Sequence, residues 1–185
     1  MKKILLFIAL CGIVAGTALA EKADSNKPTE IFADEASFDD VKQIRTLKGN
    51  VILTRGTLVM KAGLAVLRED PEGYQFVVFT AAPGAVATFR QKRDGGDLWV
   101  EGQAERIEYD NKTEAVKLFS KAKLARLEGS RVTDEVEGPF ISYDSRKEYF
   151  TVENTAAGGS TPGAGRVRMV IQPSNKPPTP ATPGK

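Results

Sequence analysis

A repeated hairpin pattern constrains the fold of this chain more than any other feature of its sequence. The stretch RIEYDNKTEAVKLF, residues 106–119, recurs in altered form as FISYDSRKEYFTV, residues 140–152. In both copies apolar and polar residues alternate on either side of a polar turn, which is typical of an antiparallel β-hairpin. A fainter copy, ADEASFD, begins at Ala33. The two clear copies begin 34 residues apart, and a repeat spacing of roughly 30 to 40 residues predicts hairpins stacked in one broad sheet.

The rest of the chain between residues 29 and 171 also has the pattern of β-strands. Short apolar or alternating runs, rich in Val, Ile, Phe and Tyr, are separated by turn formers, and no segment has convincing helical periodicity. Strands are predicted at residues 30–39, 43–55, 57–69, 74–81, 85–92, 98–110, 114–128, 130–144, 147–154 and 166–172. The fold class is therefore predicted to be all-β. A sandwich or barrel is usual for this length, but the repeated hairpins favour an elongated stack with open ends.

Glycines and turn sequences predict where the strands bend or reverse. The long strands are expected to bend or break at Gly49, Gly102, Gly129 or Gly138, because glycine permits bulges and corners. Asp70-Pro71-Glu72-Gly73 has the proline and glycine placement of a type I turn.

The two ends of the chain are predicted to lie outside this β-domain. Residues 1–20 have the charged start, apolar run and Ala18-Leu19-Ala20 exit of a cleavable signal peptide, which predicts export to the periplasm or cell exterior. Residues 21–28 are expected to be a flexible segment, and the proline-rich residues 172–185 a disordered tail. Removal of residues 1–20 would leave 24 basic and 24 acidic residues, because only Lys2 and Lys3 are charged there. A net charge near zero argues against nucleic acid as a partner.

The side chains that most enzymes use are scarce. The chain has no His, and its one Cys lies at position 11 in the expected signal peptide, so Ser-His and Cys-His catalysis and imidazole or thiolate metal sites are excluded. Carboxylate pairs such as Glu105 and Glu108 leave glycoside hydrolysis open, although a solvated strand face is the simpler interpretation. The oxygen-rich run Asp110–Glu114 lacks the spacing of a calcium loop and is expected to be a turn. We therefore expect no catalytic activity, no cofactor and no metal.

Three sequence elements resemble the OstA-like, or organic solvent tolerance, family of lipopolysaccharide export proteins. They are GNVILTRGTLVMKAG at residues 49–63, PGAVATF at residues 83–89, and the V-E-G-x-A-x-x-I-x-Y element from Val100 to Tyr109. The resemblance extends from about Thr29 to Ile171 with the elements in the same order. It departs from the family at residues 155–165 and in the proline-rich tail, which are longer than the family requires.

The resemblance implies a fold and a function. The implied fold is an open, twisted β-jellyroll of two antiparallel sheets with an apolar channel between them. The implied function is to bind lipopolysaccharide by its acyl chains and to carry it across the periplasm, from the inner to the outer membrane, as part of a transport bridge. Among the aromatic candidates for lipid contact, Phe89 and Tyr109 lie in elements that match the family. The residues expected to face the channel are Ile31, Val51, Leu53, Leu58, Met60, Phe89, Ile107, Tyr109, Leu118, Ile141 and Tyr143.

The same resemblance implies partners at the two ends of the sheet. An open jellyroll leaves unpaired edge strands, which another sheet could extend. We expect an LptC-like inner-membrane protein at the N-terminal edge, an LptD-like outer-membrane protein at the C-terminal edge, and head-to-tail association of identical copies. The residues expected at these edges are Ile31, Phe32, Phe38, Val167, Met169 and Ile171.

Three alternatives remain open from sequence. The chain could be a structural or adhesive periplasmic β-protein with a dry core, an LptC-like subunit held by an uncleaved N-terminal helix, or a carbohydrate-processing enzyme that uses carboxylates alone.

Overall fold

The computed structural model describes residue 24 and residues 26–173, so the predicted signal peptide and nearly all of the proline-rich tail lie outside the described residues. The elements bounded within these described residues are twelve strands and one short 3₁₀ helix, η1 (Ser145–Lys147). The strands are β1 (Thr29–Phe32), β2 (Glu35–Asp39), β3 (Ile44–Arg55), β4 (Leu58–Glu69), β5 (Gln75–Thr80), β6 (Ala87–Lys92), β7 (Leu98–Ala104), β8 (Arg106–Asp110), β9 (Ala115–Glu128), β10 (Arg131–Asp144), β11 (Tyr149–Glu153) and β12 (Arg168–Ile171). The predicted all-β fold is confirmed. None of the described helices is long and apolar enough to cross a membrane.

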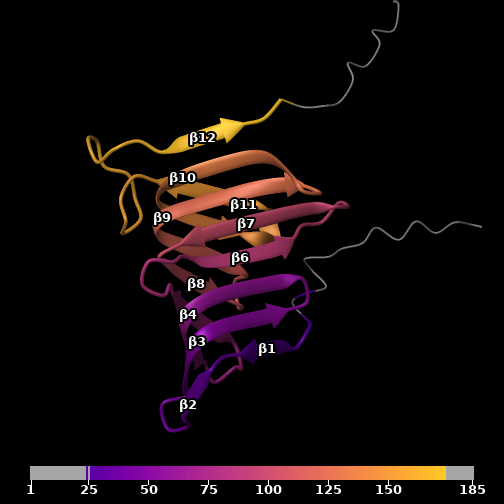
Figure 1. Cartoon of the computed structure of the whole chain (residues 1–185), viewed down its shortest axis with the longest axis vertical. Coiled ribbons are helices and arrows are strands. Elements are labelled where there is room, and N and C mark those ends of the chain that lie inside the picture. The colour runs from indigo at the N-terminus through magenta and orange to yellow at the C-terminus, as the bar shows by residue number, and fades with distance from the viewer. Residues whose placement is uncertain (1–23, 25, 174–185) are drawn as a thin grey trace, which may run out of the picture.

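Four long strands pass through both of two layered sheets. We call one layer sheet A; it pairs β1, the second half of β3, the first half of β4, β6, β7, the second half of β9, the first half of β10, and β12. The other, sheet B, pairs β2, the remaining halves of β3, β4, β9 and β10, and β5, β8 and β11. Every pairing is antiparallel. Figure 1 shows the strands stacked as rungs along the long axis, from β1 and β2 at the bottom to β12 at the top.

The two sheets are joined covalently along one side, where the long strands turn a corner. The ladder between β3 and β4 shifts register between Lys48 and Val51, and Gly49 and Asn50 both have positive φ. In β9 the corner falls at Ser120 and Lys121, which have φ of 61° and 52°. The opposite side, which we call the open side, carries the hairpin turns of both sheets. The architecture is thus a V of two sheets that are closed at the corner and meet only through side chains at the open side.

The repeated Asp of the sequence motif caps the hairpin turns of sheet B. The Oδ1 atom of Asp110 accepts hydrogen bonds from the backbone N–H groups of Lys112 and Thr113, at 2.8 and 3.3 Å. Asp39, Asp70 and Asp144 accept equivalent bonds in their own turns. The run from Asp110 to Glu114 is therefore a turn, as predicted, and the opening repeat of the sequence is a series of capped hairpins.

The strand boundaries differ from the sequence-based ones at several corners. Residues 30–39 form two strands instead of one, and residues 98–110 also divide, because the chain crosses from sheet A to sheet B at Ala33-Asp34 and at Glu105. A bend or break was expected at Gly102, and this expectation is wrong, whereas the break expected at Gly129 is confirmed. Gly102 lies inside β7, and Gly129 lies in the β9–β10 turn with φ of 61°.

Asp24 anchors the chain before the first strand. Its carboxylate accepts a hydrogen bond from the backbone N–H of Thr57, at 2.9 Å, and another from the Thr57 hydroxyl. These bonds hold the segment that precedes β1 against the β3–β4 turn.

Candidate functional site

The space between the two sheets is lined mainly by apolar side chains. Strand alternation turns one face of each sheet inward, and the inward side chains form a single cluster that runs from Leu47 to Tyr143. The expected channel residues all face this interior. Fully or almost fully buried are Val51, Leu53, Leu58, Met60, Phe89, Ile107, Tyr109, Leu118, Ile141 and Tyr143, whereas Ile31 packs against the cluster and is half-buried.

Phe89 joins the two sheets near the middle of the stack. Its ring on β6 stacks on that of Tyr143 on β10, with centroids 6.3 Å apart and an angle of 25° between the planes. Gly102, the neighbour of Phe89 across the β6–β7 ladder, leaves the space that this ring needs, because an added Cβ would collide with it. The close approach of the rings means that the sheets pack directly on one another.

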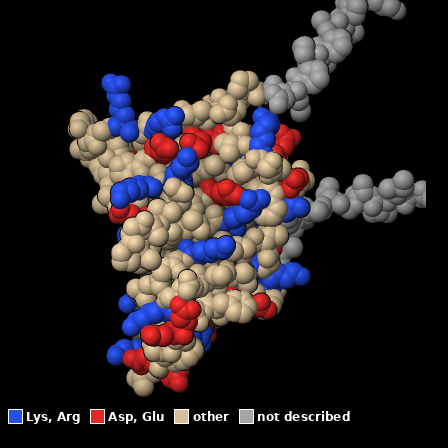
Figure 2. All heavy atoms as spheres, viewed as in Figure 1, with Lys and Arg blue, Asp and Glu red and all other residues tan. Residues whose placement is uncertain are grey.

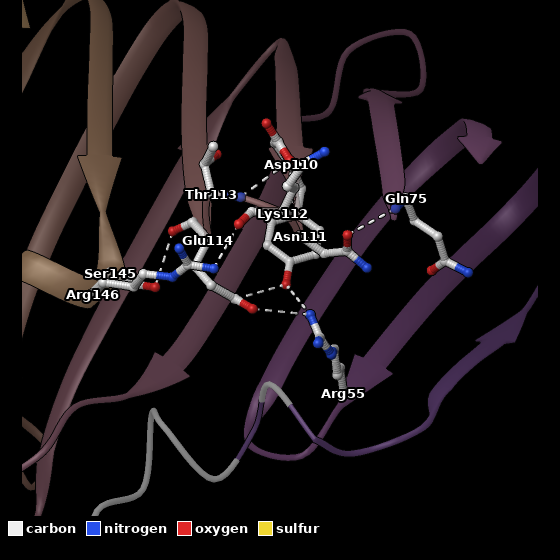
Figure 3. Close-up of polar contacts among 10 residues, drawn as sticks. Arg55, Gln75, Asp110, Asn111, Lys112, Thr113, Glu114, Ser145 and Arg146 are labelled. Carbon is white, nitrogen blue, oxygen red and sulfur yellow. Dashed lines mark hydrogen bonds and ion pairs between the residues drawn. The ribbon is translucent and has the colours of Figure 1, made fainter. Parts of the chain in front are cut away.

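Tyr109 belongs to a buried polar cluster that crosses the open side, and Figure 3 labels its other members, Arg55 and Glu114. The Nη1 atom of Arg55, at the end of β3 in sheet A, donates to the Tyr109 hydroxyl at 2.9 Å and to Glu114 Oε1 at 3.2 Å. The Tyr109 hydroxyl donates in turn to Glu114 Oε2 at 3.1 Å. Arg55 is 8% exposed and Glu114 7%. Burial, and then the nearby Glu114 carboxylate, raise the pKa of Tyr109 well above its ordinary value, so this hydroxyl stays protonated.

A second polar pair lines the interior closer to the C-terminal end. Arg126 of β9 forms an ion pair with Asp134 of β10, with an N–O distance of 3.1 Å. The guanidinium lies over the ring of Phe150, 5.2 Å from its centroid. Because Phe150 belongs to β11 in sheet B, this cation–π contact also links the two sheets.

Apolar side chains emerge at both ends of the stack. Phe32 and Phe38 are 61% and 65% exposed at the N-terminal edge, on β1 and β2. Met169 and Ile171 of β12 are 49% and 68% exposed at the C-terminal edge, and Val167 just before β12 is also exposed. Met169 pairs with Val136 and Ile171 with Asp134, so both lie on the inner face of sheet A. The apolar interior therefore continues to an open end beyond β10.

The outer faces are charged. Figure 2 shows basic and acidic side chains mixed over one side of the stack. The carboxylates that could have served catalysis are engaged in ion pairs: Glu105 with Lys121 at 2.6 Å, and Glu108 with Arg106 at 2.7 Å. Their partners, Lys121 and Arg106, are exposed, so these are ion pairs of a solvated strand face.

Sequence reasoning missed part of this site. It did not connect Arg55 with Glu114, which lie 59 residues apart, and it did not identify β11 as the second C-terminal edge. The sequence does place a Glu at the end of each polar turn, and the structure shows that Glu114 and Glu148 have φ of 55° and 49° there, where Gly or Asn is usual. The further inward residues Phe79, Leu124 and Val136 follow from the same alternation as the expected ones.

Comparisons with known proteins agree with this architecture. Residues 30–149 match the family described as "LptA/(LptD N-terminal domain) LPS transport protein". The chain is 32% identical over 170 residues to the lipopolysaccharide export system protein LptA of Haemophilus influenzae, which covers 92% of this chain and 91% of that protein. It is also 27% identical over 172 residues to the lipopolysaccharide export system protein LptH of Pseudomonas aeruginosa, covering 93% of this chain and 94% of that protein.

A solved structure supports the fold directly. The crystal structure of LptH, described as the LptA-homologous periplasmic component of the lipopolysaccharide transport device of Pseudomonas aeruginosa, superposes with a TM-score of 0.70 and 25% identity. The match covers 81% of this chain and 99% of that one. The open jellyroll implied by the sequence resemblance is therefore confirmed. The chain belongs to the LptA/(LptD N-terminal domain) family of lipopolysaccharide transport proteins.

Proposed function

We propose that this protein is an LptA-type carrier that binds lipopolysaccharide by its acyl chains between the two sheets and passes it across the periplasm from the inner to the outer membrane. The observation that carries the proposal is an interior that runs through the whole stack and is open at both ends. Its lining is mainly apolar from the N-terminal to the C-terminal edge, and the inward-facing side chains of Phe38, Met169 and Ile171 are exposed at those edges.

The physical need for such a groove follows from the cost of hydrating a lipid. At about 0.8 kcal/mol per CH₂ group, one saturated chain of about twelve carbons costs on the order of 10 kcal/mol to expose to water. A lipid with several chains would cross an aqueous compartment extremely slowly without cover. Apolar inner faces and charged outer faces satisfy this need, and the task requires no reactive group.

The edges favour association with similar sheets. β1 and β2 end the two sheets at the N-terminal side, and β12 and β11 end them at the C-terminal side. Strand addition at complementary edges would join head to tail and would not close into a ring. We assign an LptC-like protein to the edge with Ile31, Phe32 and Phe38, and an LptD-like protein to the edge with β11 and β12. Copies of this chain would extend the groove between them.

The ends of the chain fit an exported protein. We propose that residues 1–20 act as a cleaved signal peptide, that residues 29–171 are the transport domain, and that residues 172–185 form an extended tail. The homologue LptH is described as periplasmic, which supports the same compartment for this protein.

Phe150 tests the groove directly, because its neighbour Tyr149 provides a matched control on the same edge strand. Phe150 pairs with inward-facing Tyr143, whereas the 61% exposed Tyr149 points to the other face. Phe150→Ser should weaken binding of fluorescent lipopolysaccharide to the purified protein by about tenfold or more, since the aromatic surface that contacts the acyl chain is lost. Tyr149→Ser should bind as the unmodified protein does.

Equal binding by both variants would contradict a lipid-lined interior. If the unmodified protein itself binds no lipopolysaccharide, the alternative of a structural or adhesive periplasmic β-protein with a dry core would replace the carrier.

A further inference from the structure

Side chains fill the middle of the unloaded interior, between the two sheets. Ile107 and Leu118 are fully buried, and the rings of Phe89 and Tyr143 stack across the two sheets. An acyl chain can therefore lie between the sheets only after they separate. Along the corner the chain itself joins the sheets, so separation has to begin at the open side.

Two arginine–glutamate pairs span the open side. The first is Arg55 with Glu114, which joins the end of β3 in sheet A to the β8–β9 turn of sheet B (Figure 3). The second is Arg93 with Glu148, which joins the residue after β6 in sheet A to the residue before β11 in sheet B. We call these two ion pairs the clasp.

The two turns that carry the carboxylates of the clasp are hydrogen-bonded to one another within sheet B. The N–H and the hydroxyl of Ser145 both donate to the backbone carbonyl of Glu114, at 3.1 and 3.0 Å. Arg146 donates to the carbonyl of Lys112 at 2.6 Å. The turns that carry Glu114 and Glu148 are thus tied into one unit, and movement of one displaces the other.

The backbone at both glutamates indicates a role beyond the turn itself. Glu114 and Glu148 adopt φ of 55° and 49°, a region that favours glycine, and Gly73 occupies the corresponding end of the β4–β5 turn with φ of 85°. Gln43 also has a positive φ, 53°, at the end of the β2–β3 turn, but at Glu114 and Glu148 the carboxylate reaches an arginine of the opposite sheet. Strained positions of this kind point to a function when the side chain has a specific partner.

The second pair is the more exposed of the two. The side chains of Arg93 and Glu148 are 14% and 32% exposed, compared with 9% for each member of the first pair. Among the described residues, Arg93 Nε is buried without a hydrogen-bond partner. A pair that is partly hydrated and incompletely satisfied separates more easily than the buried one.

We propose that the clasp holds the two sheets together in the unloaded protein and that acyl chains enter the interior laterally, by parting the sheets at the open side. This inference rests on the proposed carrier function. It adds the route of entry: the lipid passes between the turns, and the Arg93–Glu148 pair opens before the buried Arg55–Glu114 pair.

A reversible bridge across the clasp tests the route. In a Cys11→Ala background, Arg93→Cys with Glu148→Cys would be joined by a bismaleimide linker that contains a disulfide. The bridged protein should bind fluorescent lipopolysaccharide at least about tenfold more slowly than the same protein before bridging. Reduction of the linker should restore the rate. A matched bridge between Arg90→Cys and Glu101→Cys, an ion pair that lies within sheet A, should leave the rate unchanged.

Charge variants provide a second readout of the same contact. Glu148→Gln should accelerate binding by about two- to fivefold, the range expected for loss of a partly exposed ion pair. Exchange of the charges, Arg93→Glu with Glu148→Arg, should return the rate toward that of the unmodified protein.

Two outcomes would overturn the inference, and they are distinguishable. If the bridged protein binds as fast as the unbridged one, the lipid enters through the ends of the stack and the clasp is not its gate. If the unbridged protein binds no lipopolysaccharide, the carrier function itself fails, and the proposed entry route fails with it.

Discussion

Replacing Glu114 by Gln should lower the free energy of unfolding by about 3–5 kcal/mol, because it leaves the buried Arg55 charge without its carboxylate. Arg55 is 8% exposed, and its Nη1 atom lies 3.2 Å from Glu114 Oε1. The substitution keeps the size of the side chain, so the loss reports charge compensation and not packing. Urea denaturation followed by circular dichroism measures the change, provided that the transition is two-state.

Two controls separate the buried pair from its neighbour. Glu148→Gln removes the partner of a more exposed pair and should cost no more than about 1 kcal/mol. The double substitution Arg55→Met with Glu114→Met removes both charges and should be less destabilising than Glu114→Gln alone. A double variant less stable than the single one would show that the cluster stabilises the fold by itself, contrary to this account.

Replacing Met169 by Pro should abolish head-to-tail association while leaving the fold nearly unchanged. The N–H of Gln172 donates to the carbonyl of Thr133 on β10, at 2.8 Å. In the alternating pattern of antiparallel strands, the N–H of Val170 then also points to β10, whereas that of Met169 points to the free edge. Proline at position 169 removes a donor that this chain does not use but that an added strand would need.

Val170→Pro is the matched control, because it removes a donor that bonds within the sheet. It should detach β12 and lower stability. Sedimentation velocity over a range of concentrations should show an association constant at least about tenfold lower for Met169→Pro, from a lost hydrogen bond and a steric clash at the edge. Unchanged association by the stably folded Met169→Pro variant would exclude β12 as the docking strand.

Most of the fold could be predicted from local pattern. The alternation in residues 106–119 and 140–152 determines both the hairpins and the face that each side chain takes, because strand periodicity assigns Ile107 and Leu118 to one side. The same rule predicts which of the other channel residues point inward. That such residues contact lipid remains a prediction, since inward-facing apolar residues also occur in closed cores.

The corners and the clasp could not be predicted in the same way. A corner at Ser120-Lys121 has no glycine to mark it, and the long strand β9 looks continuous in sequence. Gly102 has the sequence signature of a bend, but it serves as space for the ring of Phe89. Arg55 meets Glu114 only because β3 and the β8–β9 turn come together at the open side, and that depends on the three-dimensional arrangement of the whole stack.

The central claim, that lipid lies between the sheets, is tested most directly by photo-crosslinking in cells. A compact photoreactive residue would replace Ile107, which is fully buried, in one strain and neighbouring Glu108, which faces outward in an ion pair with Arg106, in another. If lipid lies between the sheets, a lipopolysaccharide adduct is expected from position 107 and none from position 108. Adducts from position 108 alone, or from neither position in folded and exported protein, would contradict it.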